Sequence, residues 1–238
     1  MDTLEKEREL GQSRLLHIAG DQKTIGLLRG LHTMRCEDDN GCDRLDYMQL
    51  NIGLFHFDMT YAVSLHKQYM GTSSMRGLRH AIDITKRKGL SNAKTKGTFH
   101  YDLRELIHHS TEAHILSLWL LEGGVGSIVE LRKRSPDELK KIAERIFIKH
   151  TSSAALSEMD QLPDDEKDEL RREAVMWCRD ALHYMLFVKA IKHGDVGIIE
   201  AMLPHLLYRF IGGGHNKYAT EVMELLMMLH RQLSPAAA

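Results

Sequence analysis

An aspartate stands directly after a short apolar segment near the beginning of the sequence. Residues 14–19 (RLLHIA) are too few for a lone helix and predict a buried strand that stops at Gly20-Asp21. Enzymes that transfer nucleotidyl groups with two metal ions need several carboxylates to converge on cations about 3.5–4 Å apart. Asp21 is therefore a candidate metal ligand at a strand end. The alternative is that Asp21 caps a helix starting near Gln22.

A second candidate carboxylate lies close to the other end of the sequence. Glu221 and Glu224 belong to a predicted helix over residues 217–233. At about 100° per residue, Glu221 falls at the edge of the apolar face and Glu224 falls well round toward solvent. A glutamate at that edge can reach a site between a helix and a sheet. The alternative is a solvated helix flank.

Histidines and cysteines raise two further metal-site hypotheses. Glu105 and His108 have the Glu-x-x-His spacing of carboxylate-bridged di-iron bundles, but we find no second copy of the motif. Zinc-binding residue types also occur nearer the N-terminus, at His32, Cys36, Cys42 and His56. Their spacing matches no usual zinc module, so we expect metal at neither place.

A basic segment without acidic residues interrupts the helical part of the chain. Five cations fall in the predicted loop over residues 86–97: Lys86, Arg87, Lys88, Lys94 and Lys96. Such a loop can contact the phosphates of DNA. Phe99 is the nearest aromatic residue, so the loop lacks the stacking platform typical of single-strand binding. A solvated loop is the alternative.

Composition and motifs exclude several classes of protein. The net charge of −1 gives no whole-protein field for nucleic acid, so any contact with DNA must come from a local patch. No apolar stretch approaches 18 residues, so we expect no membrane partner. Three cysteines without a secretory leader predict reduced thiols in an intracellular protein, with the nuclear and cytoplasmic alternatives left open. Gly212-Gly213-Gly214 follows a predicted helix, so it is a helix terminator and no dinucleotide fingerprint.

The elements that must position these residues are mostly helices. Strands are predicted over residues 14–19 and 47–55, with a helix over 24–31 between them. Helical periodicity then predicts helices over 57–69, 74–88, 101–121, 136–150, 164–193, 195–210 and 217–233. Ser135, Pro136 and Glu138 form a capping-box pattern, and we expect Pro163 to open the next helix similarly. The prediction is a mainly α helical array with a small two-strand β element, in one domain over residues 1–238.

Several sequence stretches together resemble a known family. They are GDQ at 20–22 with Thr24, EDDN at 37–40, LHKQY at 65–69 with GTS at 71–73, RKGL at 87–90, MW at 176–177, and GGG at 212–214 with KYA at 217–219 and Glu221. The chain is similar in these stretches to a domain-of-unknown-function family expanded in mushroom-forming fungi. The resemblance covers about residues 15–233. The resemblance implies a mobile-element origin, but it implies no particular activity.

The order of the candidate residues also resembles that of cut-and-paste transposases with an RNase H-like core. In those enzymes the second catalytic Asp follows a strand, and then come a helix, another strand, often a histidine, a large helical insertion and a Glu on a late helix. Asp21, His56 and Glu221 stand in this order here. The resemblance implies a truncated RNase H-like core with a helical insertion. It also implies catalytic roles for all three residues, and Mg²⁺ or Mn²⁺ on Asp21 and Glu221.

Two departures from the transposase pattern predict that the chain cannot cleave DNA alone. No strand bearing the first catalytic Asp precedes Asp21, and Gly53 stands three residues before His56, where such enzymes usually carry Cys or Asp. We therefore expect the C-terminal part of a longer, transposase-like protein that is catalytically incomplete and has DNA as its candidate partner. The alternative is a non-catalytic helical protein-interaction module. A third hypothesis is a metalloenzyme built on the helix around Glu105 and His114.

Overall fold

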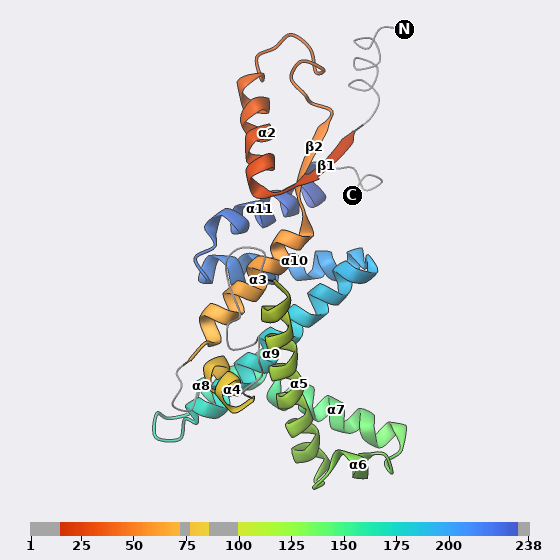
Figure 1. The fold of residues 1–238 in the computed structure, drawn as a ribbon, viewed down its shortest axis with the longest axis vertical. Coiled ribbons are helices and arrows are strands. Elements are labelled where there is room, and N and C mark those ends of the chain that lie inside the picture. The colour runs from red at the N-terminus through yellow and green to blue at the C-terminus, as the bar shows by residue number, and fades with distance from the viewer. Residues whose placement is uncertain (1–14, 72–76, 86–99, 233–238) are drawn as a thin grey trace. The chain divides into compact units, whose positions relative to one another are not determined.

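The structure is a computed structural model that describes residues 15–71, 77–85 and 100–232. Within these residues the strands are β1 (Leu16–Gly20) and β2 (Met48–Ile52), and the helices are α2 (Gln22–Met34), α3 (Leu54–Tyr69), α4 (Gly77–Thr85), α5 (His100–Gly123), α6 (Ile128–Leu131), α7 (Pro136–His150), α8 (Ser153–Asp160), α9 (Glu169–His193), α10 (Val196–Gly212) and α11 (Asn216–Met227). A π-helical segment, Met228–Gln232, follows α11. The predicted mainly α fold with a small two-strand element near the N-terminus is confirmed (Figure 1). The truncated RNase H-like core stays a prediction.

The chain divides into two compact units. Unit 1 consists of residues 1–60 and 203–238, and unit 2 consists of residues 61–202. Unit 1 is therefore formed from both ends of the sequence, whereas unit 2 is formed from its continuous middle. The boundaries fall inside α3 and α10. The single domain over residues 1–238 stays a prediction.

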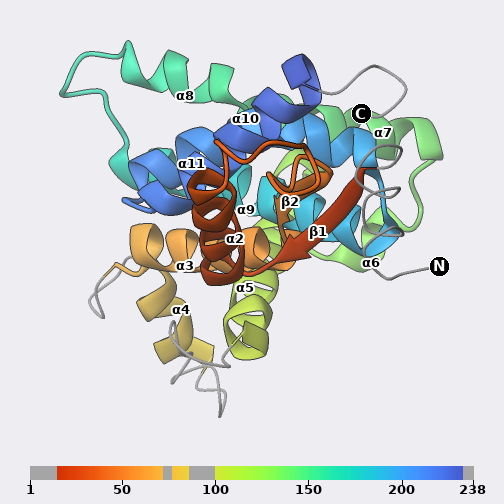
Figure 2. The same ribbon diagram turned by 90° about the horizontal axis from the view of Figure 1, so that it is seen from above.

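Unit 1 contains the strand pair. β1 and β2 are parallel, with Leu16 opposite Met48 and Gly20 opposite Ile52. Parallel neighbours cannot be joined by a tight turn, so the chain crosses over through α2 and the loop that follows it. α2 packs against both strands (Figure 2). Its Ile25 is completely buried. The helix thus covers only part of the strand pair, and Leu16 on β1 stays 50% exposed, so β1 is not the buried strand that the sequence predicted.

The C-terminal part of unit 1 packs around one buried aromatic ring. The ring centroid of Phe210 lies 5.9 Å from that of Phe57 and 6.1 Å from that of Tyr218. Gly214 has a φ of +74°, a conformation that favours glycine, and the reversal there lets the His215 amide donate to the Phe210 carbonyl at 2.8 Å. The glycine run therefore ends α10, as predicted, and α11 turns back to pack against β2.

Unit 2 is a helical array built around its two longest helices. α5 has 24 residues and α9 has 25, and the two pack against each other. α7 packs on both of them, and α8 packs on α7 and α9. Cys178 lies in this interior on α9, where burial raises the pKa of its thiol to about 12 and so keeps the thiol protonated. None of the helices that the structure describes is both long and apolar enough to cross a membrane.

A buried carboxylate joins α3 to α9 inside unit 2. Asp180 is 2% exposed and accepts the Tyr69 hydroxyl at 2.5 Å. Nε of Arg179 donates to the other carboxylate oxygen at 2.9 Å, and Nη2 of Arg179 lies 2.9 Å from the same oxygen. Tyr61 donates to the Asp180 carbonyl at 3.2 Å. Because its charge is paired and its oxygens accept hydrogen bonds, this aspartate can be buried without the large cost of an isolated ion.

Several boundaries differ from the sequence-based predictions, among them the start of α9, the end of β2 and the ends of α2, and α8 was not predicted. The capping box at Ser135 is confirmed and α7 begins at Pro136. The predicted start of α9 near Asp164 is wrong, because residues 164–166 form a turn and α9 begins only at Glu169, where Asp168 accepts the Arg171 amide at 2.9 Å. The strand predicted over 47–55 ends at Ile52, and α3 starts at Leu54.

Replacing Tyr69 should test the buried Asp180 network. Tyr69→Phe removes the hydroxyl donor and keeps the ring packed edge-on against Trp177, whose centroid lies 5.2 Å away. We expect the free energy of unfolding to fall by about 2 kcal/mol, the usual size for a hydrogen bond to a buried charge. Urea denaturation measures it. The control, Tyr101→Phe, removes a hydroxyl from a side chain that is 80% exposed and should stay within about 0.5 kcal/mol of wild type. An equal loss in both variants would contradict this role.

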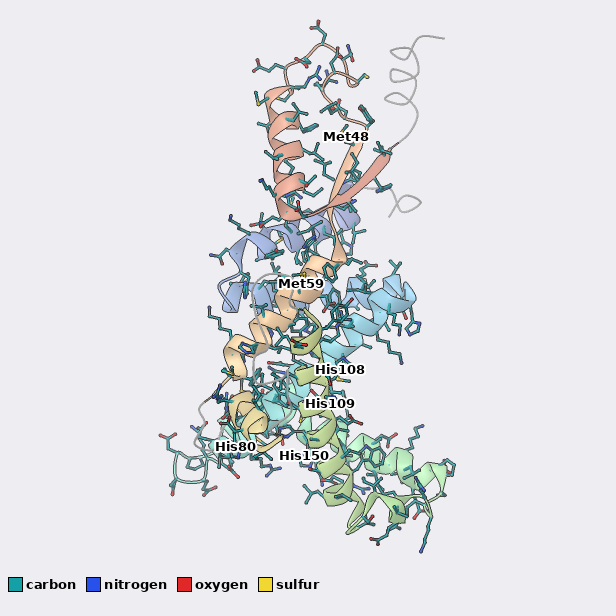
Figure 3. All side chains as sticks on the ribbon, viewed as in Figure 1. Met48, Met59, His80, His108, His109 and His150 are labelled. Carbon is teal, nitrogen blue, oxygen red and sulfur yellow. The ribbon has the colours of Figure 1, made fainter. Side chains whose placement is uncertain are left out.

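A second charged cluster joins α5 to α7. Oε2 of Glu122 accepts Nε of Arg145 at 3.0 Å, and Oε1 lies 3.0 Å from Nε2 of His150 and 3.4 Å from Nζ of Lys149. His150 is buried on the last turn of α7 (Figure 3). The hydrogen bond with His150, followed by those from Arg145 and Lys149, lowers the pKa of Glu122 below its usual value near 4.5.

The Glu122 cluster should contribute a pH-dependent part of the stability. Because the folded-state pKa of Glu122 is depressed, its contribution is complete above the unfolded value and is lost as the pH falls through the folded value. We expect Glu122→Gln to lower the urea midpoint at pH 7. The difference in urea midpoint between the variant and the wild type should shrink below about pH 4.5. Glu144→Gln, on an exposed residue of α7, is the matched control. A difference in urea midpoint that stays constant from pH 7 to pH 3 would contradict a pH-dependent contribution of Glu122.

Candidate functional site

Asp21 follows β1 directly and caps α2. Its Oδ1 accepts the backbone N–H of Thr24 at 2.7 Å, and the carboxylate is exposed. The hydrogen bonds from the Thr24 backbone and hydroxyl lower the pKa of Asp21, and the nearby His56 and Lys23 lower it further. The capping role that we considered as the alternative is therefore present. A metal-binding or catalytic role for Asp21 stays a prediction.

His56 lies at the same edge of the strand pair as Asp21. It belongs to the first turn of α3, just after β2, and its amide donates to the Gly53 carbonyl at 2.9 Å. Gly53 in turn donates to the Gly20 carbonyl at 2.9 Å, so the carboxyl ends of the two strands are joined. A Cβ on Gly53 would meet the His56 ring at 3.6 Å, an ordinary contact, so packing does not demand glycine there. The parallel pairing thus brings Asp21 and His56 together.

Glu221 pairs with an arginine rather than with Asp21. Its Oε1 accepts Nη1 of Arg29 at 2.8 Å, and the Glu221 side chain is only 6% exposed, deeper than the face edge that we predicted. Its Oε2 is buried and makes no hydrogen bond among the described residues. Arg29 follows Asp21 by eight residues, which is about 12 Å along a helix axis. In this arrangement Asp21 and Glu221 have different partners.

A cavity of about 420 Å³ lies between α2, β2 and α11 within unit 1. Its polar lining consists of Arg29, His32, Asp46, Gln49, Asn51, Glu221 and Glu224. The first turn of α2 is not part of this lining, so Asp21 lies outside the cavity. Arg29 and Asp46 were not among the site residues predicted from the sequence, because no local pattern relates Arg29 to a partner 192 residues away.

Metal-binding groups do not converge in the part of the chain that the structure describes. No set of three or more His, Cys, Asp or Glu side chains there could hold a metal ion. On α5, His109 lies 3.1 Å from Glu105 and 3.8 Å from Glu112, an ion-pair geometry on an exposed helix surface (Figure 3). No metal-dependent step follows from this arrangement, and Mg²⁺ or Mn²⁺ on Asp21 and Glu221 stays a prediction. The five predicted nucleic-acid contacts, Lys86, Arg87, Lys88, Lys94 and Lys96, lie outside the described residues.

Two substitutions at Asp21 separate capping from any chemical role of its carboxylate. Asp21→Ala removes the cap and should lower the thermal unfolding midpoint, whereas Asp21→Ser keeps a hydroxyl that caps helices nearly as well. In the wild type, the stability that the Asp21 cap contributes should be lost at acid pH, because the pKa of Asp21 is depressed in the folded state and its protonation therefore destabilises that state. Circular dichroism melts at pH 7 and pH 3 measure both effects. A serine variant as unstable as the alanine variant would contradict the capping role.

Comparison with known proteins places the whole chain in one family. A family model described as a family of unknown function, DUF6589, matches residues 1–238. No curated protein and no solved structure matches the chain.

Proposed function

The chain belongs to the DUF6589 family, and we propose that it is a transposase-like protein, derived from a mobile element, that binds DNA and cannot cleave it alone. One observation carries the proposal. The β1–α2–β2 unit places Asp21 and His56 together at the carboxyl ends of two parallel strands. Ligands and reacting groups bind at that edge in α/β proteins.

The order of the elements supports the same proposal. Unit 2, in which all the regular elements that the structure describes are helices, follows the strand pair in the sequence and separates it from α11. α11 returns to unit 1, packs against β2 and carries Glu221. This is the order of a transposase core that is interrupted by a helical insertion and completed by a late glutamate. The expansion of the family in mushroom-forming fungi, which we also propose, is what a mobile-element origin would produce.

The hydrogen-bond partners of Asp21 and Glu221 support the proposal that the chain cannot cleave DNA alone. Two-metal chemistry requires carboxylates that converge on the same pair of cations. Here Oδ1 of Asp21 accepts the Thr24 amide, and Oε1 of Glu221 accepts Arg29. Gly53 supplies no side chain beside His56. Within the described residues, the strand ends therefore form a scaffold without a metal-binding set.

A second candidate function is a helical protein-interaction module, and exposed apolar side chains in unit 2 favour it. Leu121 at the end of α5 is 65% exposed, and Phe147 and Ile148 on α7 are 64% and 61% exposed. Val129 on α6 is 59% exposed. Exposed apolar side chains of this size can be buried against a protein partner. This function needs neither DNA nor the residues at the strand ends.

Binding to duplex DNA tests the proposed function. We expect fluorescence anisotropy with a labelled duplex to show binding at low salt that weakens steeply as salt rises, because cations that contact phosphates release counterions. Replacing Lys86, Arg87, Lys88, Lys94 and Lys96 with Gln should flatten the slope of log K against log salt by up to about 0.9 for each phosphate contact removed. With Mg²⁺ or Mn²⁺ present, the same duplex should remain uncleaved.

The matched control replaces five exposed lysines elsewhere, namely Lys133, Lys140, Lys141, Lys189 and Lys192, with Gln. It changes the net charge by the same amount and should leave most of the binding intact. Equal losses in the two variants would show that only overall charge matters. If the wild-type chain does not bind at low salt, the DNA proposal fails and the interaction module takes its place. Metal-dependent cleavage would refute the catalytically incomplete form.

A further inference from the structure

We propose that the cavity between α2, β2 and α11 binds a small organic cation, one that carries a guanidinium or a primary ammonium group. The proposal does not depend on DNA binding. It concerns unit 1 alone and rests on the partners of Glu221, on the charges that line the cavity, and on the cavity's volume.

Glu221 is a buried carboxylate with half of its hydrogen-bonding capacity unused. Arg29 donates to Oε1 at 2.8 Å, whereas Oε2 is buried without a partner among the described residues. Leaving a buried charged acceptor unsatisfied costs more than a typical hydrogen bond contributes. Glu221 lines the cavity, so a modest rotation of its carboxylate would present Oε2 to a donor bound there. The unsatisfied oxygen therefore indicates a ligand that donates hydrogen bonds.

The charges around the cavity favour a cation. Three carboxylates line it (Asp46, Glu221 and Glu224), against one guanidinium, that of Arg29. Asp46 is already paired, since Nη2 of Arg44 lies 3.0 Å from its Oδ2 and His32 lies 3.6 Å from its Oδ1. Glu224 takes part in no ion pair within the described residues. With Asp46 paired and Glu221 bound to Arg29, Glu224 leaves one uncompensated negative charge at the cavity, which would repel an anionic ligand and attract a positive one.

The neutral residues of the cavity suit a ligand with several N–H groups. Gln49 and Asn51 alternate along β2, so they share one face of the strand, and both line the cavity. The Gln49 amide nitrogen donates to the sulfur of Met228 at 2.6 Å, which ties the β2 wall of the cavity to the segment that follows α11. Amide oxygens on this face can accept N–H donors that a carboxylate does not reach.

An organic cation fits these residues better than a metal ion does. A metal needs several ligands at short, fixed distances, and no three suitable side chains converge in the described part of the chain. Guanidinium and ammonium groups instead spread several donors over separate acceptors. The volume of about 420 Å³ lies within the usual range of small-molecule sites, roughly 300–1,000 Å³. Arg29 already shows that this glutamate accepts a guanidinium.

Two ligands of the same shape provide the test. n-Butylguanidinium and n-butylurea differ mainly in charge, and isothermal titration calorimetry on the full chain would measure both up to about 10 mM. We expect the guanidinium to bind at least about tenfold more tightly, as a charge-assisted hydrogen bond implies. A blocked Gly-Arg-Gly peptide is the third ligand. Tighter binding of the peptide would assign the site to an arginine side chain of a partner, and weaker binding would assign it to a free small molecule.

Variants identify the residues responsible. Glu221→Gln should weaken butylguanidinium binding at least about tenfold, and Glu224→Gln should weaken it several-fold. Arg29→Met should tighten it, because the competing guanidinium is removed, and a purely structural Arg29–Glu221 pair would not produce that gain. Glu37→Gln, an exposed carboxylate of the same unit outside the cavity lining, is the control and should bind like wild type.

The proposal is overturned if the wild-type chain binds neither ligand, or binds butylurea as well as butylguanidinium. It also fails if Glu221→Gln and Glu224→Gln both bind like wild type. If Glu221→Gln does not fold, Glu224→Gln and Arg29→Met still decide the matter, because their predicted effects have opposite signs. DNA anisotropy on the same variants keeps this test separate from the proposed function, since Glu224→Gln should leave DNA binding unchanged.

Discussion

The parallel pairing of β1 with β2 constrains the whole of unit 1. Parallel strands must be connected by a crossover, which here begins with α2 directly after β1, and α3 follows β2 at the same edge of the pair. Asp21 and His56 lie just after the carboxyl ends of β1 and β2. They share one edge of the strand pair because the two strands are parallel. A pair of strands also needs apolar cover on more than one side. α2 provides part of that cover, and α11, from the other end of the sequence, packs against β2.

The two units bury carboxylates in different ways, and the difference bears on function. Asp180 in unit 2 is surrounded by donors from Tyr69 and Arg179, so its burial stabilises the contact between α3 and α9. Glu221 in unit 1 has a single arginine partner and an unsatisfied second oxygen beside a cavity. A paired and saturated charge has the properties of a structural element. A half-satisfied charge beside a cavity instead leaves an acceptor that a bound donor can use.

The candidate residues of the sequence fall into two groups in space. Asp21 and His56 meet at the strand ends, while Glu221 lies against Arg29 on the side of α2 that faces the cavity. The transposase-like proposal depends on the first group and on the order of the elements. The cation-binding proposal depends on the second group. Both belong to unit 1, in which segments separated by the helices of unit 2 are joined.

Local sequence patterns determined the helical character of the chain, the two strands and several helix ends. The Ser135 capping box shows why, because its donors and acceptors all lie within three residues of one another. The same logic failed at Pro163, where the turn before Asp168 is an equally local alternative that the pattern does not distinguish. Asp21 was correctly seen as a possible cap, since its partner Thr24 is also local. Only the tertiary structure decided that the strands are parallel, that Glu221 is buried, and that Arg29 pairs with it across 192 residues. No short-range periodicity carries that information, because such contacts depend on how whole helices pack.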